Sequence, residues 1–172
     1  TQDGVAKVID ELKSEFDIVL CDSPAGIERG AFFAMYFADR AVVVVNPEVS
    51  SVRDSDRVLG IMSSKSRRAE QGQTAVKEHL LLTRYSPERV ERGDMMSIGD
   101  VEEILGVKVI GVIPESPEVL SASNSGVPVI LDENSDAGQA YTDAVARLLG
   151  DTVPMRFLDA KKKGFFQRLF GS

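Results

Sequence analysis

The sequence predicts an α/β fold in which a mostly parallel sheet carries helices on both faces. Three observations support this prediction. Short apolar runs alternate along the chain with segments of helical spacing. The runs are apolar almost throughout, as is typical of strands buried on both faces. The 172 residues suffice for one domain with a sizeable core.

The first half of the chain begins with a helix and a strand. Helical spacing predicts a helix over 5–12, and an apolar run predicts a buried strand over 16–21. A second helix is expected over 31–38. The β-branched run 41–45 predicts the next strand, and a polar-faced helix follows over 51–70.

The second half continues this alternation. Further strands are predicted over 79–84, 107–113 and 127–131. Helices are predicted over 97–105, 117–124 and 136–149, each followed by a glycine that can terminate it. Ser97 is the expected N-cap of the first of these helices, and Pro114 stops the strand predicted over 107–113.

Charge is spread unevenly and limits the possible classes of function. The net charge is −7, but residues 157–172 alone sum to +3, which leaves −10 for the rest. An acidic body argues against a general nucleic-acid binder. A basic tail on an acidic body indicates an anionic surface as partner.

The cysteine and histidine content and the hydropathy of the chain further limit the possible classes of protein. The one cysteine, Cys21, cannot form an internal disulfide, which favours a reducing compartment. With His79 as the one histidine, a protein-only zinc site is not expected. No run of about 20 apolar residues exists, so no membrane-spanning helix is expected.

The strand predicted over 16–21 leads into Asp22, and Gly26 follows four residues later. Carboxyl ends of parallel strands open onto the ligand crevice, where a carboxylate can hold Mg²⁺ directly or through water. Gly26 would let the backbone approach a phosphate. The alternative is a strand cap and turn without a ligand. A hydrolytic triad has no support, because Ser23 has His79 as its one possible base.

A phosphate-binding enzyme of this kind also needs a G-x-x-x-x-G-K-[ST] loop, which this sequence lacks. Two explanations stay open: the loop lies upstream of Thr1, or the protein is not an ATPase. Because the chain begins with Thr1 and its first residues resemble the middle of a helix, we expect missing sequence upstream.

Several segments together resemble the MinD family of deviant Walker A ATPases, which is related to ParA. They are residues 16–27, 46–56, 77–85, 109–115 and 128–132. Residues 163–171 resemble the family's membrane-targeting sequence. The resemblance implies a P-loop NTPase fold of MinD/ParA type whose first strand and phosphate loop are missing here.

The same resemblance implies a domain organisation. Residues 1–150 would be the C-terminal part of the ATPase domain, 151–156 a linker, and 157–172 a membrane-targeting amphipathic helix.

The resemblance also implies a function, which is ATP-dependent selection of the cell-division site. The full-length protein would dimerise with ATP and Mg²⁺, bind anionic lipid through its C-terminal helix, recruit the division inhibitor MinC and be released by MinE-stimulated hydrolysis. It would be cytoplasmic and peripheral on the cytoplasmic face of the inner membrane, with no nucleic-acid partner. This chain alone would be inactive.

Site residues follow from the resemblance position by position. Asp22 would be the Walker B aspartate near Mg²⁺, and Gly26 the switch II glycine facing the γ-phosphate. The remaining nucleotide-site candidates are Thr83, Arg84, Pro114 and Glu115, at the strand ends where the family places its adenine-recognition loops.

The helix predicted over 51–70 carries the partner candidates. Ser50 or Ser51 is expected to cap it, with Asp54 in its first turn. From the residues alone its charged side is a solvated, self-paired face. The resemblance makes it the dimer surface that also meets MinC and MinE. The candidate contacts are Arg53, Asp54 and Asp56.

The tail has the composition of an interfacial helix. Its large apolar residues share one sector of a helical wheel between basic flanks, although Lys162 falls inside that sector. The membrane candidates are Lys163, Phe165, Phe166, Arg168, Leu169 and Phe170. The alternative is a tail that packs on its own domain or on a partner helix.

Three other functions compete with the ATPase. One is a catalytically inactive module for membrane docking and partner binding. Another is a ParA-type partition ATPase acting on DNA, against which the acidic body and amphipathic tail argue. A nitrogenase-iron-protein-like reductase is disfavoured because Cys21 leaves too few thiolates for a bridging cluster.

Overall fold

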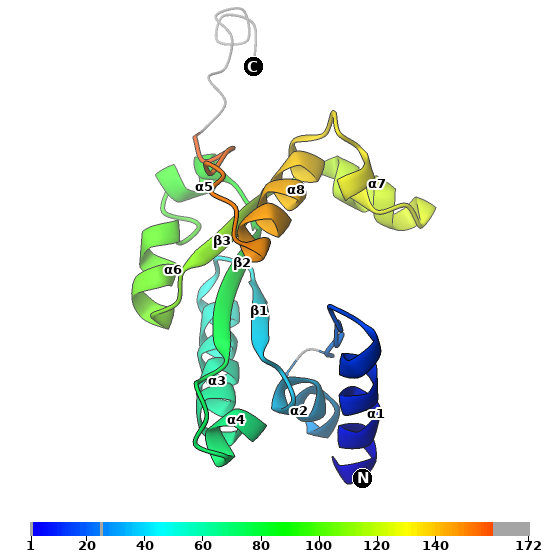
Figure 1. The fold of residues 1–172 in the computed structure, drawn as a ribbon. Helices are drawn as coiled ribbons and strands as arrows, with labels where there is room; N and C mark the ends of the chain where they lie inside the picture. Colours follow the sequence, from blue (N-terminus) through cyan, green and yellow to red (C-terminus); the bar gives the residue numbers. More distant parts are fainter. Residues whose placement is uncertain (1, 25, 160–172) are drawn as a thin grey trace, which may run out of the picture.

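A computed structural model describes residues 2–24 and 26–159 of the chain, drawn in Figure 1. The three strands are β1 (Arg40–Val45), β2 (Lys77–Tyr85) and β3 (Val109–Pro114). The helices of the first half are α1 (Gln2–Glu15), α2 (Arg29–Tyr36), α3 (Val49–Lys65) and α4 (Arg67–Glu70). Those of the second half are α5 (Pro87–Glu91), α6 (Ile98–Leu105), α7 (Pro117–Ser125), the 3₁₀ turn η1 (Val129–Leu131) and α8 (Asp136–Leu149).

The sheet is parallel and runs in the order β1-β2-β3. Val43 lies opposite Leu80, and Leu82 opposite Val112. All three strands therefore present their carboxyl ends at one edge of the sheet. The predicted α/β class is confirmed, because helices cover both faces of this sheet.

One face packs against α3 and α6. Leu80 and Leu82 are fully buried there, in a cluster that includes Val52 and Met62 of α3 and Val101 of α6. Apolar residues spaced three and four apart bring the buried side of α3 onto the strands. This cluster is the main core of the domain.

The other face packs against α8, which lies across β3 (Figure 1). Gly111 permits the close approach, since a Cβ built there would lie 2.5 Å from Cβ of Ala144 and 2.7 Å from Leu81 Cδ1. Ile113 joins Ala137 and Ala140 in a second, smaller cluster. Small residues on both elements thus set the distance between helix and sheet.

Helices α1 and α2 form a separate unit beside the sheet (Figure 1). Ile9 packs with Tyr36 and Phe37 in a small apolar cluster of their own. Tyr36 donates a 2.6 Å hydrogen bond to Glu70 of α4, which raises the pKa of the tyrosine. The pKa of Asp39 is lowered, first by the hydrogen bond from Lys13. These contacts tie α1 and α2 to the amino ends of the strands.

The strand predicted over 16–21 is wrong, because this stretch is not assigned to any helix or strand. Phe16, Ile18 and Leu20 are exposed, Leu20 to 88%. A β-prone run becomes a strand when it pairs and packs, and no neighbouring strand pairs with it in the described structure. As a result, β1 is an edge strand of the described sheet, and its Val44 side chain is exposed.

The strand predicted over 127–131 is also wrong. Pro128 has no N–H to give to a ladder, and the hydrogen bonds of this stretch are local. The backbone of Leu131 donates to the Pro128 carbonyl and that of Asp132 to the Val129 carbonyl. The result is the 3₁₀ turn η1.

The helix predicted over 51–70 begins earlier and is interrupted. It starts at Val49 after the N-cap position Glu48, so neither predicted serine caps it and Asp54 lies beyond its first turn. Ser51 Oγ instead accepts from the Asn46 backbone at 3.1 Å. Ser66 leaves the helical region and caps α4.

Several local predictions are confirmed. Ser97 caps α6 in a capping box with Asp100, and Gly106 ends that helix in the left-handed region. Gly126 and Gly150 end α7 and α8 in the same way. The short helix α5 was not predicted, although Ser86-Pro87 is a common way to begin one.

Candidate functional site

The carboxyl ends of the three strands bring polar side chains together. Thr83 Oγ1 near the end of β2 donates a 2.9 Å hydrogen bond to Oδ1 of Asn46, which follows β1. The backbone N–H of Glu115, after β3, donates to the Tyr85 carbonyl at 2.9 Å. Loops after neighbouring parallel strands are the usual place for a ligand in this fold class.

Arg84 and Glu115 form an exposed pair at this edge. The guanidinium Nη2 lies 3.8 Å from Oε1 of Glu115, and both side chains are largely open to solvent. Arg84 has a φ of +57°, a conformation that non-glycine residues seldom adopt and that is often found at functional sites. Such a weak, exposed pair can exchange its partner for a ligand at little cost.

Asn46 was missed as a site candidate. Its side chain accepts from Thr83 at Oδ1, and its backbone N–H donates to Ser51 Oγ, so both parts of the residue are held. The signal was present in the sequence, because Asn46 directly follows the apolar run that became β1. The predicted pairs Thr83-Arg84 and Pro114-Glu115 are brought together, and Asn46 belongs with them.

Asp22 and Gly26 are not brought to that edge. Both are exposed, in a stretch outside the sheet that Figure 1 shows beside α1. Gly26 has a φ of +92°, which suits glycine. Ser23 Oγ donates to the neighbouring Pro24 carbonyl, and no described contact joins it to His79. Burial lowers the pKa of His79, whose Nε2 has no hydrogen-bond partner among the described residues.

Asp22 is the carboxylate of this stretch that the resemblance offers to a magnesium ion. The described residues hold no group of three His, Cys, Asp or Glu side chains that could enclose a metal. Mg²⁺ characteristically takes one or two carboxylates and completes its shell with phosphate oxygens and water. Asp22 fits a metal of that kind, which arrives with a nucleotide.

The partner candidates lie on the outer side of α3. Arg53, Asp54 and Asp56 are exposed, while Val52 and Ser55 between them are buried. Asp54 lies 3.5 Å from Arg57 in a pair that is more than two-thirds exposed on both sides. These charges therefore face solvent and contribute little to folding.

The membrane candidates, from Lys163 to Phe170, lie outside the described residues. Within the part that is described, no helix has the length and apolar character to cross a bilayer. The last described residue, Asp159, lies close to Tyr85 of β2. Burial raises the pKa of Tyr85, and the negative charge of Asp159 raises it further.

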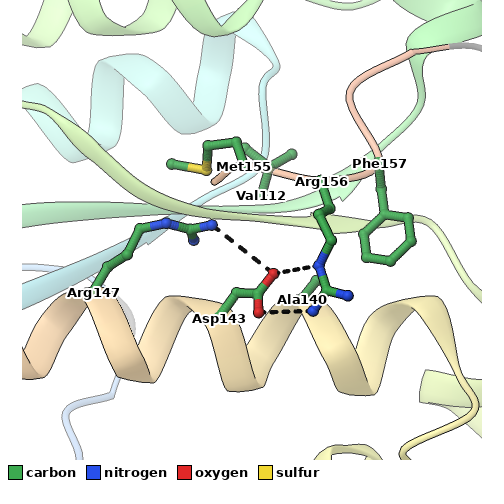
Figure 2. Close-up of a pocket in the computed structure, with 7 residues that line it drawn as sticks. All are labelled: Val112, Ala140, Asp143, Arg147, Met155, Arg156 and Phe157. Atoms are coloured by element: carbon green, nitrogen blue, oxygen red, sulfur yellow. Dashed lines mark hydrogen bonds and ion pairs between the residues drawn. The ribbon is translucent and has the colours of Figure 1, made fainter. Parts of the chain in front are cut away.

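A charged cluster that the sequence did not indicate lies beneath the end of the described chain (Figure 2). Asp143 of α8 is buried, and it pairs with Arg156 at 2.6 Å and with Arg147 at 3.9 Å. The carboxylate of Asp143 raises the pKa of Arg156. Arg147 lies four residues after Asp143 on α8, a spacing that the sequence shows, whereas Arg156 comes from the segment after the helix and has no short-range sequence signature.

Curated proteins provide close sequence relatives. The chain is 64% identical over 172 residues to the septum site-determining protein MinD of Escherichia coli K12, a match that covers 99% of this chain. It is 61% identical to the protein of the same name from Neisseria meningitidis. The chain spans 64% of the length of each of these relatives. No family model matches the chain.

Solved structures share the fold. The MinD cell division protein of Aquifex aeolicus superposes with a TM-score of 0.81 at 39% identity, over 91% of this chain and 64% of that one. A MinC:MinD complex from the same organism superposes equally well, over 62% of its chain. A Pyrococcus horikoshii MinD complexed with Mg-ADP, at 24% identity and a TM-score of 0.70 over 87% of this chain and 58% of that one, supports the fold alone.

Proposed function

This chain belongs to the MinD family, and from that premise we propose that the full-length protein is an ATPase that selects the cell-division site. The observation that carries the proposal is the 64% identity to a septum site-determining MinD over 99% of the chain. In this proposal ATP drives dimerisation, the dimer binds anionic lipid and recruits MinC, and MinE-stimulated hydrolysis releases it. In this proposal the phosphate loop would lie in the part of the relatives' length that this chain does not span.

The carboxyl edge of the sheet supports a nucleotide site. Asn46, Thr83, Arg84 and Glu115 offer amide, hydroxyl, guanidinium and carboxylate groups at one place, suited to polar recognition of a base. Asp22 would hold a nucleotide-borne Mg²⁺, which neutralises charge on the phosphates during hydrolysis. Gly26 would offer its backbone N–H to the γ-phosphate.

Nucleotide-dependent sedimentation with vesicles tests this function. We expect the full-length protein to pellet with anionic vesicles in ATP and to stay in solution in ADP, because two weak tails on one dimer bind much more tightly than one. Phosphate release should occur with the full-length protein and be absent with residues 1–172 alone, which lack the G-x-x-x-x-G-K-[ST] motif.

Equal pelleting in ADP and ATP would contradict the proposed cycle. Phosphate release by residues 1–172 alone would contradict the placement of the phosphate loop elsewhere. Turnover stimulated by DNA and not by lipid would favour the ParA-type alternative.

The outer side of α3 is the proposed surface for MinC. Asp54→Ala is expected to weaken binding of MinC to the ATP-bound full-length protein at least tenfold while changing the free energy of unfolding by less than about 0.5 kcal/mol, because the pair with Arg57 is exposed. Isothermal titration calorimetry and urea unfolding give the two quantities.

A control for the MinC prediction is available on another helix. Glu103→Ala removes one exposed acid from α6, and it should leave MinC affinity unchanged. Wild-type affinity in Asp54→Ala, or the same loss in both variants, would contradict the assignment of this surface.

A further inference from the structure

The segment after α8 is held by one arginine. Nε of Arg147 donates to the Val153 carbonyl at 2.7 Å, and its Nη2 donates to the Pro154 carbonyl at 2.5 Å. The same guanidinium donates through Nη1 to the Ile110 carbonyl of β3 at 2.8 Å. Arg147 therefore joins α8, β3 and the following segment. Residues 153–158 are called the C-terminal strap below.

A second arginine closes the strap onto α8 (Figure 2). Nε and Nη2 of Arg156 donate to the two carboxylate oxygens of Asp143 at 2.6 and 2.7 Å. Asp143 is 7% exposed, so this two-pronged pair is shielded on the carboxylate side. Nη1 of Arg156 also reaches Oε1 of Gln139 at 2.8 Å.

Apolar side chains of the strap pack on both clusters of the domain. Met155 and Leu158 contact the main core, whereas Phe157 contacts the smaller cluster beneath α8. Phe157 has a φ of +63°, a backbone conformation that phenylalanine seldom adopts and that packing must hold in place. Polar and apolar contacts together make the strap part of the folded domain.

The strap ends at the same edge of the sheet as the candidate nucleotide site. Asp159, the last described residue, is close enough to Tyr85 for its charge to affect the tyrosine. The carbonyl of Tyr85 accepts from the backbone of Glu115, which pairs with Arg84. The described chain therefore ends beside the strand ends.

We propose that the strap, closed by Arg147 and by the Asp143–Arg156 pair, is a positioning device that keeps the membrane tether short. This inference rests on the proposed function, in which two tails of one dimer bind lipid. In the sequence, six residues (159–164) lie between the strap and Phe165, whereas fourteen (151–164) lie between Gly150 at the end of α8 and Phe165.

Tether length controls how strongly the second tail adds to the first. Effective concentration falls roughly as the −3/2 power of linker length once the linker can span the two sites. Lengthening from about six to about fourteen residues then weakens ATP-dependent binding roughly three- to fourfold. Binding through a single tail does not depend on this length.

Two insertions of the same composition test the proposal in the full-length protein. Eight Gly and Ser residues placed between Asp159 and Ala160 lengthen the tether beyond the strap. The same eight residues placed between Asp151 and Thr152 form a loop ahead of the strap and leave the tether after the strap at its original length. Binding to vesicles of equimolar phosphatidylglycerol and phosphatidylcholine is measured by sedimentation in ATP and in ADP.

In ATP we expect the insertion after Asp159 to raise the apparent Kd roughly three- to fourfold and the insertion after Asp151 to leave it unchanged. In ADP both should match the wild type. Both insertions keep every strap residue, so the fold is preserved, and thermal unfolding followed by circular dichroism checks this. Equal losses at the two positions, or no loss at either, would overturn the proposal.

A charge-neutral variant tests the ion pair itself. Asp143→Asn with Arg156→Gln removes the pair and keeps the net charge, while Arg147 loses its 3.9 Å carboxylate neighbour but keeps its three backbone carbonyl acceptors. In that background the insertion after Asp151 should weaken ATP-dependent binding, because the inserted residues then add to the length of the membrane tether. If that insertion stays silent, the pair does not hold the strap. A wild-type protein that pellets equally in ADP and ATP would instead refute the proposed function and leave the strap contacts unaffected.

Discussion

Deleting residues 160–172 from the full-length protein is expected to abolish its ATP-dependent recruitment to anionic vesicles. Each large apolar side chain that enters the lipid contributes about 1.5–3 kcal/mol, and each cation near the surface about 1 kcal/mol. Ordering the tail costs about 1–2 kcal/mol per residue for the backbone alone. One tail is therefore marginal, and a dimer without tails has no such contact.

Sedimentation in ATP measures this loss, which should exceed about tenfold in apparent affinity. Removing Gly171 and Ser172 alone is the matched control, because every large apolar residue and every cation of the tail remains. Phosphate release without vesicles should be the same in all three proteins. Unchanged recruitment after the long deletion would refute the tail as the membrane contact.

Gly138→Ala is expected to destabilise the domain by about 1–3 kcal/mol, because the new methyl group has no space. Gly138 lies in the first turn of α8, where its N–H donates to Ser135 Oγ at 2.8 Å. A Cβ there would overlap the carbonyl oxygens of Asp132 and Val129, the latter at 2.6 Å. These are backbone atoms, so α8 must move away from η1.

The same substitution elsewhere gives the opposite sign. Gly60 lies inside α3, and a Cβ built there meets nothing within 4 Å. Gly60→Ala should stabilise the protein by about 0.5–1 kcal/mol through helix propensity. Urea unfolding of the nucleotide-free full-length protein measures both. A neutral Gly138→Ala would show that η1 and α8 separate easily.

Features governed by neighbouring residues were predictable from the sequence. Ser97, Asp100 and Gly106 specify the two ends of α6 within one short stretch. Ser97 and Gly106 act as predicted, and Asp100, which was not predicted, completes the capping box. The runs that became β1, β2 and β3 were found to within two residues, since each is apolar and punctuated by polar or proline residues. The roles of Asp22, Arg53 and the tail residues stay predictions.

Errors arose where long-range pairing decides the outcome. Phe16 to Leu20 has the composition of a buried strand, yet composition cannot supply the neighbouring strand that its backbone needs. Residues 127–131 have a strand-like composition too, but Pro128 lacks an N–H, and the backbone hydrogen bonds of this stretch are local ones within a 3₁₀ turn.

The sequence by itself determined the fold class, the order of the three strands along the chain, both ends of α6, the glycine ends of α7 and α8, and the family. Short-range periodicity, capping and ordered motifs are properties of the chain itself. Only the tertiary structure decided that Asn46 joins Thr83 at the strand ends and that Arg147 and Arg156 hold the segment after α8. The physical reason is that a hydrogen bond or ion pair forms between groups that packing brings within about 3 Å, whatever their separation in sequence.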